Sequence, residues 1–313
     1  MKLVILGNGF DLHHGYKTSF SDFRNHLLNS KEENDKKLIS DVDIVLKSQK
    51  INIEEGILWN DFEKIIGKIM QNGSKTKKIA DIQLLSLTEK FTQRFYHYLI
   101  QEIKKNDFII NKKIKKELES SNSILTFNYT NSYTKYLNNK NLDIFHIHGE
   151  LSEQNLPLIG FYYSNVGELN SSDYLRKYKG KAFHKPALAY KQNGINLTKR
   201  INQFILKWSS KITQVIIIGY SFGESDSHIY SILNNILVDQ NQSEYIPFQQ
   251  ADKIPTINFK LFNYNSKETN KLISKLKENI FSESNRRSSV YITGKGTFTP
   301  EIKDIITFEA IDY

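Results

Sequence analysis

A short apolar strand that runs into a glycine turn at the start of the chain constrains the fold more than any other feature. Residues 3–6 read Leu-Val-Ile-Leu, and residues 7–11 read Gly-Asn-Gly-Phe-Asp. A continuous apolar run bounded by glycine is typical of a strand buried on both faces, as in parallel sheets covered by helices. We therefore predict an α/β fold in which this strand is central.

Four later segments have the residue pattern of an extended strand and are followed by a polar or glycine-containing turn. They are residues 123–127, 143–147, 215–218 and 257–262, and a last strand is expected near 290–293, after a helix that begins at Ser266. Turns at the carboxyl ends of parallel strands face the same side of a sheet, so these turns should converge on one site. The predicted architecture is a Rossmann-like parallel sheet flanked by helices.

Two long segments depart from this pattern. Residues 21–119 carry spaced apolar residues among Lys, Glu and Asn, which predicts an insertion of three or four amphipathic helices after the first strand. Residues 151–205 are irregular, with Pro157, Pro186 and several tyrosines, and are interpreted as a lid or a partner surface. The 313 residues include only 5 prolines that could mark linkers, so we expect a single domain that contains both segments.

Composition excludes several classes of protein. The chain has no cysteine, so disulfides, a thiolate nucleophile and a cysteine-ligated metal are ruled out. It has neither a signal peptide nor an apolar run of about 18 residues, which predicts a cytoplasmic protein without a membrane partner. The formal charge of +9 could attract phosphates. This charge is spread over many lysines without a nucleic-acid motif, so a nucleic-acid partner is only a minor alternative.

Two glycine turns are candidate phosphate or ribose cradles. Gly7 and Gly9 allow a tight turn and close approach to a pyrophosphate at the start of a helix. The strict dinucleotide fingerprint is broken by Leu12, so a plain strand-to-helix turn is the alternative. The second turn, residues 219–228, contains two glycines and several hydroxyls, and a capped helix start at Asp226 is its alternative reading.

Two further turns carry side chains suited to catalysis. Asn128 follows a strand, and its amide can donate and accept hydrogen bonds at once, which suits orienting a ribose or a water molecule. His146 and His148 should share one face of a strand. A histidine is the side chain best suited to accept a proton at neutral pH. The alternatives are a turn-stabilising Asn and structural histidines; a metal site is less favoured, because no other ligands cluster there.

Taken in order, these segments resemble the AbiH-like family of phage abortive-infection proteins. The matching stretches are residues 5–12 with Gly15 and Thr18-Ser19, then 59–63, 127–130, 146–149 and 219–226. That family is in turn distantly similar to sirtuins and sirtuin-like NAD hydrolases, so the resemblance implies a sirtuin-like version of the Rossmann-like fold. Zinc-binding sirtuin deacylases hold their metal with four cysteines, which this chain lacks, so a deacylase is disfavoured.

The resemblance implies that NAD is the substrate and that no metal is required. Asn128 would bind the nicotinamide ribose or the catalytic water, and His148 would be the base. The nucleotide would be held by a set of turn residues, in which the role of Asp11 is open apart from contact with a ribose hydroxyl: Gly7, Asn8, Gly9, Asp11, Thr18, Gly219, Ser221 and Asn263.

The expected function is an NAD glycohydrolase that acts as an antiphage effector and cleaves NAD to nicotinamide and ADP-ribose. Defence by loss of NAD needs a resting state, so we expect control by self-association, by a regulatory partner or by a phage-derived trigger. The alternative is a catalytically inactive defence protein with the same fold that senses nucleotides or associates with nucleic acid.

Overall fold

The structure is a computed structural model of the chain, and it places a six-stranded sheet at the centre of the molecule. It describes residues 1–47, 62–63, 79–105, 109, 111–137, 142–151, 158–159, 197–208, 211–222, 229–230, 232–233, 236, 257–263, 266–284, 291–293, 296–298 and 306–312. The strands of the central sheet are β1 (Lys2–Leu6), β2 (Ser123–Thr126), β3 (Asp143–His146), β4 (Gln214–Ile218), β5 (Ile257–Asn263) and β8 (Ile306–Asp312).

The strand order is β3-β2-β1-β4-β5-β8, and every neighbouring pair is parallel. This is the order of the Rossmann fold, in which the chain changes direction across the sheet between the first and fourth strands. The predicted α/β class, the parallel sheet and the central position of the first strand are therefore confirmed.

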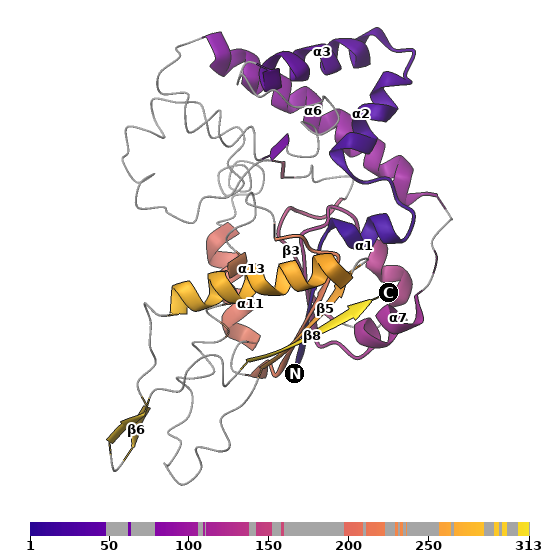
Figure 1. Cartoon of the computed structure of the whole chain (residues 1–313). Helices are drawn as coiled ribbons and strands as arrows, with labels where there is room; N and C mark the ends of the chain where they lie inside the picture. Colours follow the sequence, from indigo (N-terminus) through magenta and orange to yellow (C-terminus); the bar gives the residue numbers. More distant parts are fainter. Residues whose placement is uncertain are drawn as a thin grey trace.

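Helices cover both faces of this sheet (Figure 1). Leu3 and Ile5 of β1 pack toward α11 (Leu197–Trp208) and α13 (Ser266–Ser284), while Val4 and Leu6 pack toward α1 (Asn8–His13), α7 (Lys112–Glu119) and the 3₁₀ helix η1 (Ser132–Tyr136). Each fully buried aliphatic side chain stabilises the fold by about 1.5–3 kcal/mol. Burial on both faces explains why residues 3–6 of β1 and 215–218 of β4 are apolar without interruption.

Three helices from the predicted insertion form a second core of their own. They are α2 (Phe20–Leu28), α3 (Glu33–Lys47) and α6 (Ile79–Ile103), and they lie beyond the carboxyl ends of the strands (Figure 1). Their shared core is rich in aromatic rings, with Phe62 and Phe91 stacked at 4.4 Å between ring centroids. Ser19 starts α2 with a capping box, in which Ser19 and Asp22 each satisfy the other's backbone N–H.

The last helix of segment 21–119 behaves differently from the other three. Ile114 and Leu118 of α7 pack on the sheet, so α7 is the crossover helix between β1 and β2. Only residues 62–63 of the stretch 59–63 are described.

Two expectations about the second half of the chain were wrong. The strand expected near 290–293 forms at β6 (Tyr291–Thr293), but it pairs with β7 (Gly296–Phe298) in a separate antiparallel hairpin, and β8 is the last strand of the main sheet. Residues 197–205 were expected to be irregular and belong to the amphipathic helix α11. The rest of segment 151–205 lies outside the described residues, apart from Leu151, Leu158 and Ile159.

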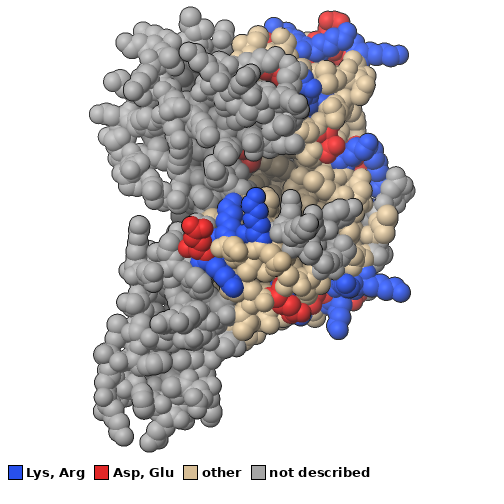
Figure 2. All heavy atoms as spheres, viewed as in Figure 1, with Lys and Arg blue, Asp and Glu red and all other residues tan. Residues whose placement is uncertain are grey.

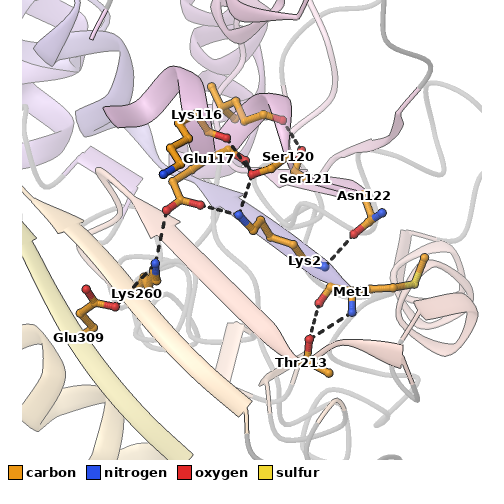
Figure 3. Close-up of polar contacts among 11 residues, drawn as sticks. Met1, Lys2, Lys116, Glu117, Ser120, Ser121, Asn122, Thr213, Lys260 and Glu309 are labelled. Atoms are coloured by element: carbon orange, nitrogen blue, oxygen red, sulfur yellow. Dashed lines mark hydrogen bonds and ion pairs between the residues drawn. The ribbon is translucent and has the colours of Figure 1, made fainter. Parts of the chain in front are cut away.

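A network of charged groups ties α7 to the sheet (Figure 3). The Glu117 carboxylate accepts a hydrogen bond from the Lys2 ammonium at 2.6 Å and lies 3.5 Å from the Lys260 ammonium, which is also 3.7 Å from Glu309. Ser120 accepts a second hydrogen bond from Lys2 at 2.6 Å. The side chains of Lys2, Lys260 and Glu117 are only 11–22% exposed, so these charges depend on one another.

Glu117→Ala is expected to lower the free energy of unfolding by about 1–3 kcal/mol, because it leaves two half-buried ammonium groups without their shared carboxylate. Urea unfolding at pH 7 measures the effect. Glu119→Ala is the matched control on the same helix, since Glu119 is 41% exposed and faces Lys115 at 3.8 Å. A change for Glu117→Ala no larger than that of the control would show that the network does not stabilise the fold.

Charges on the described surface are mixed in sign. On the face shown in Figure 2, Lys and Arg gather in small groups with acidic residues beside them. Among the described residues, several lysines are ion-paired, including Lys36 with Glu33, Lys37 with Asp41 and Lys207 with Asp143. This pattern favours a solvated surface over a nucleic-acid binding stripe on this face. None of the helices described here is long and apolar enough to cross a membrane.

Candidate functional site

The turns that were expected to converge lie along one edge of the sheet. The last residues of the strands are in register across the sheet, with His146 opposite Thr126, Thr126 and Ile218 on either side of Leu6, and Phe262 opposite Ile218. Neighbouring strands are about 4.8 Å apart. The candidate residues therefore follow one another along the carboxyl edge in the order His148, Asn128, the turn at Gly7–Gly9, the turn at Gly219–Ser221 and Asn263, of which only the backbone is described.

The two glycine turns pack directly against each other at the switch point between β1 and β4. The Gly9 amide donates to the Gly219 carbonyl at 2.8 Å, and the Gly7 amide donates to the Ile218 carbonyl at 3.0 Å. A Cβ at Gly7 would lie 2.5 Å from the Tyr220 Cα, and one at Gly9 would lie 2.7 Å from the Gly219 oxygen. These glycines are needed for backbone contact between the turns, and the amides of Gly7 and Gly9 both donate to protein carbonyls.

Polar groups border these turns. Asn8 is exposed, and its side-chain oxygen accepts a hydrogen bond from the buried Thr18 hydroxyl at 2.7 Å, so Thr18 holds the Asn8 side chain in place.

Ser221 is exposed in the turn that follows β4. It precedes Phe222, which is fully buried and has a φ of 54°, an unfavourable value for a residue with a side chain. The carbonyl of Phe222 accepts a hydrogen bond from the Lys275 ammonium of α13, which helps to hold this conformation.

Asn128 combines deep burial with an unsatisfied amide. The residue is 2% exposed, and neither its side-chain oxygen nor its side-chain nitrogen has a hydrogen-bond partner among the described residues. Its backbone is held by the Thr126 hydroxyl, which accepts the Asn128 N–H at 3.1 Å. A buried polar atom without a partner costs about 1–3 kcal/mol, so such groups in native proteins usually await a ligand or an ordered water. The chemistry of this amide suits a group that both donates and accepts.

The turn that carries His148 runs beside the turn that carries Asn128. Ile147 donates to the Thr126 carbonyl at 2.9 Å, and Leu151 donates to the Tyr129 carbonyl at 3.0 Å. The His148 ring lies against the rings of both chain neighbours of Asn128, with centroid distances of 5.5 Å to Phe127 and 5.4 Å to Tyr129. His148 is only 3% exposed.

The two histidines expected on one strand face have different surroundings. The strand β3 ends at His146, so His148 lies in the following turn rather than in the strand. The His146 ring contacts the Tyr133 hydroxyl at 2.7 Å and the Asn128 carbonyl at 3.4 Å. Burial lowers its pKa, which favours a neutral ring that donates from Nδ1 and accepts at Nε2. His146 therefore supports the Asn128 backbone.

Asp11 belongs to a buried cluster that sequence reasoning missed. The carboxylate, 1% exposed, accepts hydrogen bonds from the Thr130 hydroxyl at 2.6 Å and from the Ser132 hydroxyl. Burial raises the pKa of Asp11 from 3.8 to about 6, against the effect of these hydroxyls and of the nearby Asn128 amide. The hydroxyls that follow Asn128 in the sequence were the available signal, but a contact with a residue 119 positions earlier cannot be read from spacing.

The raised pKa of Asp11 makes a prediction about stability. Between pH 4 and 6 the unfolded chain ionises this group before the folded chain does, so stability should fall as the pH rises through this window, by about 3 kcal/mol in total. The cost is absent below pH 3.8 and complete above about pH 6. Chemical unfolding from pH 4 to 7.5 measures it, with Asp11→Asn as the comparison. Parallel pH curves for the two proteins would contradict this assignment.

In the described part of this edge, the side chains do not form the ligand set of a metal site. Among the described residues, no group of three or more His, Asp or Glu side chains is arranged to hold a metal ion. The donor set that the site presents is an amide, hydroxyls, a carboxylate and imidazoles, which suits an uncharged polar group such as a ribose.

Comparison with known proteins identifies the family. A model of the family described as bacteriophage abortive infection AbiH matches residues 3–248, which is most of the chain and includes the turns after β1, β2, β3 and β4. A search of curated proteins gave no significant match. The chain therefore belongs to the AbiH family, whose described role is abortive infection in bacteria attacked by phage.

Proposed function

We propose that this AbiH protein is an NAD glycohydrolase, which defends the cell by cleaving NAD to nicotinamide and ADP-ribose. The observation that carries the proposal is the buried Asn128 amide, whose polar atoms have no hydrogen-bond partner of normal geometry among the described residues, in a turn that is hydrogen-bonded to the turn of His148. The Rossmann strand order supports it, because dinucleotides bind at the carboxyl edge near the point where strand order reverses. A distant likeness to sirtuin-like NAD hydrolases, inferred from the same motifs, also supports it.

In this proposal the bond between the ribose C1′ and the nicotinamide nitrogen breaks, and both electrons leave with nicotinamide. Positive charge develops on the ribose as an oxocarbenium-like species, which one water molecule attacks. The Asn128 amide would orient the ribose or this water. The His148 imidazole would accept the proton that the water releases, so that NAD and water yield nicotinamide, ADP-ribose and a proton.

The low exposure of His148 fits an enzyme with a closed resting state. The Leu158 amide donates to the His148 carbonyl at 2.8 Å, and Leu158 and Ile159 are buried. The helical insertion also contacts the turn after β2, because the Tyr129 hydroxyl donates a hydrogen bond to Glu63 at 3.2 Å. Because His148 is only 3% exposed, substrate would reach the imidazole only after a local rearrangement, which a phage-derived trigger, a regulatory partner or self-association would bring about.

The direct test is to incubate the purified protein with NAD and follow nicotinamide by chromatography, with and without extract of phage-infected cells. We expect nicotinamide and ADP-ribose in equal amounts, with faster release in the presence of infected-cell extract. The proposal fails if no nicotinamide is released under either condition while the Asn128→Ala and His148→Ala variants still protect cells.

A second candidate is a defence protein that binds a nucleotide as a signal and does not hydrolyse it. The observation that favours it is that His148 is 3% exposed and enclosed by aromatic rings. Calorimetry separates the candidates, since a sensor would bind NAD or ADP-ribose without turnover and would tolerate loss of the imidazole.

A further inference from the structure

Asp11 connects the two central turns of the candidate site. It lies in α1, directly after the Gly7–Gly9 turn, while its two hydroxyl partners lie in the loop between β2 and η1, directly after Asn128. The contact therefore spans about 120 residues of sequence and joins the turn after β1 to the turn after β2. Asp11, Asn128, Thr130 and Ser132 are each 1–2% exposed, so no solvent competes for these hydrogen bonds.

The Asn128 amide lies beside this carboxylate and interacts with it closely enough to lower the Asp11 pKa. Among the described residues, neither polar atom of the amide has a hydrogen-bond partner of normal geometry. A carboxylate attracts the amide nitrogen, which carries two donor hydrogens, and repels the amide oxygen. An ionised Asp11 therefore favours one of the two flipped orientations of the amide, with the nitrogen toward Asp11 and the oxygen away from it.

An ionised carboxylate in this position is costly to the fold, because burial opposes its charge. Buried charges that a fold maintains at a cost are found more often at functional sites than elsewhere. Thr130 and Ser132 both donate to Asp11, which leaves the carboxylate as an acceptor and stabilises its ionised form.

We propose that Asp11 is a positioning residue for Asn128: its carboxylate, held by Thr130 and Ser132, fixes the orientation of the Asn128 amide and presents the amide oxygen to the ribose hydroxyl or water of the substrate. This inference rests on the proposed function and gives Asp11 a role through Asn128 rather than by direct contact with a ribose.

Other titratable groups surround this cluster and must be separated from Asp11 in any pH experiment. They are His13 at the end of α1 and His14 directly after it, Tyr133 and Lys135 on η1, and His146 and His148 at the end of β3 and in its following turn. Burial lowers the pKa of His13, His14 and His146. Asp11→Asn is the cleanest variant, since it removes the charge, keeps the shape of the side chain and leaves every histidine in place.

The test measures kcat and KM for NAD with Asp11→Asn and Thr130→Val, and uses Asp41→Asn on the exposed face of α3 as the matched control. We expect Asp11→Asn to lower kcat 10- to 100-fold with KM within about 3-fold, as for a group that acts on orientation in the transition state. Thr130→Val should give a smaller loss of the same kind, and Asp41→Asn should match the wild type. A wild-type kcat in Asp11→Asn, or a loss that follows a lower Tm at pH 7.5, overturns the inference.

A second readout is independent of turnover. The side-chain NH2 signals of Asn128, assigned by their disappearance in Asn128→Asp, should shift with pH in the wild-type protein, with a midpoint near the Asp11 pKa of about 6. They should not show this transition in Asp11→Asn. If the wild-type protein releases no nicotinamide, the proposed enzyme is wrong, and these signals still decide the role of Asp11: identical pH profiles in the two proteins would refute it.

Discussion

Gly219→Ala is expected to lower the free energy of unfolding by about 3–5 kcal/mol, a large part of the stability of a typical domain. Gly219 has a φ of 61°, in the left-handed region that costs a residue with a Cβ about 1–2 kcal/mol. A Cβ there would also lie 2.1 Å from the Phe10 nitrogen and 2.4 Å from the Gly9 carbonyl carbon. Both neighbours are backbone atoms, so the turns after β1 and β4 would have to separate.

Gly15→Ala is the matched control for this change. Gly15 also has a positive φ, of 86°, but it is exposed, so its substitution should cost only about 1–2 kcal/mol. Urea unfolding of the three proteins measures both values. If Gly219→Ala and Gly15→Ala lowered the free energy of unfolding equally, the close contact between the two glycine turns would not contribute to stability.

His148→Asn is expected to lower the kcat for nicotinamide release by about 10²–10⁴-fold, the range over which a positioned base accelerates a reaction. Asparagine keeps a polar side chain between Phe127 and Tyr129 but cannot accept the proton from water at neutral pH. In phage-infected cells that carry this variant, NAD should stay undiminished and protection against the phage should be lost. Chromatography of the reaction products measures the first effect and plaque counts the second.

His97→Ala is the control for this variant, because His97 is exposed on α6 and belongs to the helical insertion. It should retain wild-type turnover and protection. His148→Ala serves as a second variant, and its Tm shows whether loss of the ring also loosens the turn. A kcat of His148→Asn within 3-fold of the wild-type value would show that the imidazole is not the base.

The sheet was predictable because its strands obey a strong pattern. Strands buried on both faces are mostly apolar, and β1, β2 and β4 each show a buried run followed by a polar or glycine-containing turn. In β5 the buried residues Ile257, Phe259 and Leu261 alternate with half-buried polar residues, which is the pattern of a strand with one less covered face. The sequence pattern did not predict the edge strand β8. Its residues 307–311 are only exposed or half-buried, so the strand has no continuous apolar run. The segment at 290–293 also has the pattern of a strand, yet it pairs within its own hairpin.

The identity of the site residues was easier to predict than their contacts. Asn128, His148 and the glycine turns stand directly after strands, so topology alone brings them to one edge. The packing of Gly9 on Gly219 and the bond from Thr130 to Asp11 depend on how α1 crosses the ends of β4 and β2. Such contacts join residues more than 100 positions apart, and no local pattern specifies them.

The central claim is that the turns at the carboxyl edge surround one dinucleotide. A crystal structure of the His148→Asn variant with NAD tests this most directly, because the variant should bind substrate without consuming it. The account predicts the nicotinamide ribose within hydrogen-bond distance of the Asn128 amide, and the adenosine half toward Ser221. NAD bound on another surface, or an Asn128 amide that stays without a partner at saturating NAD, would contradict it.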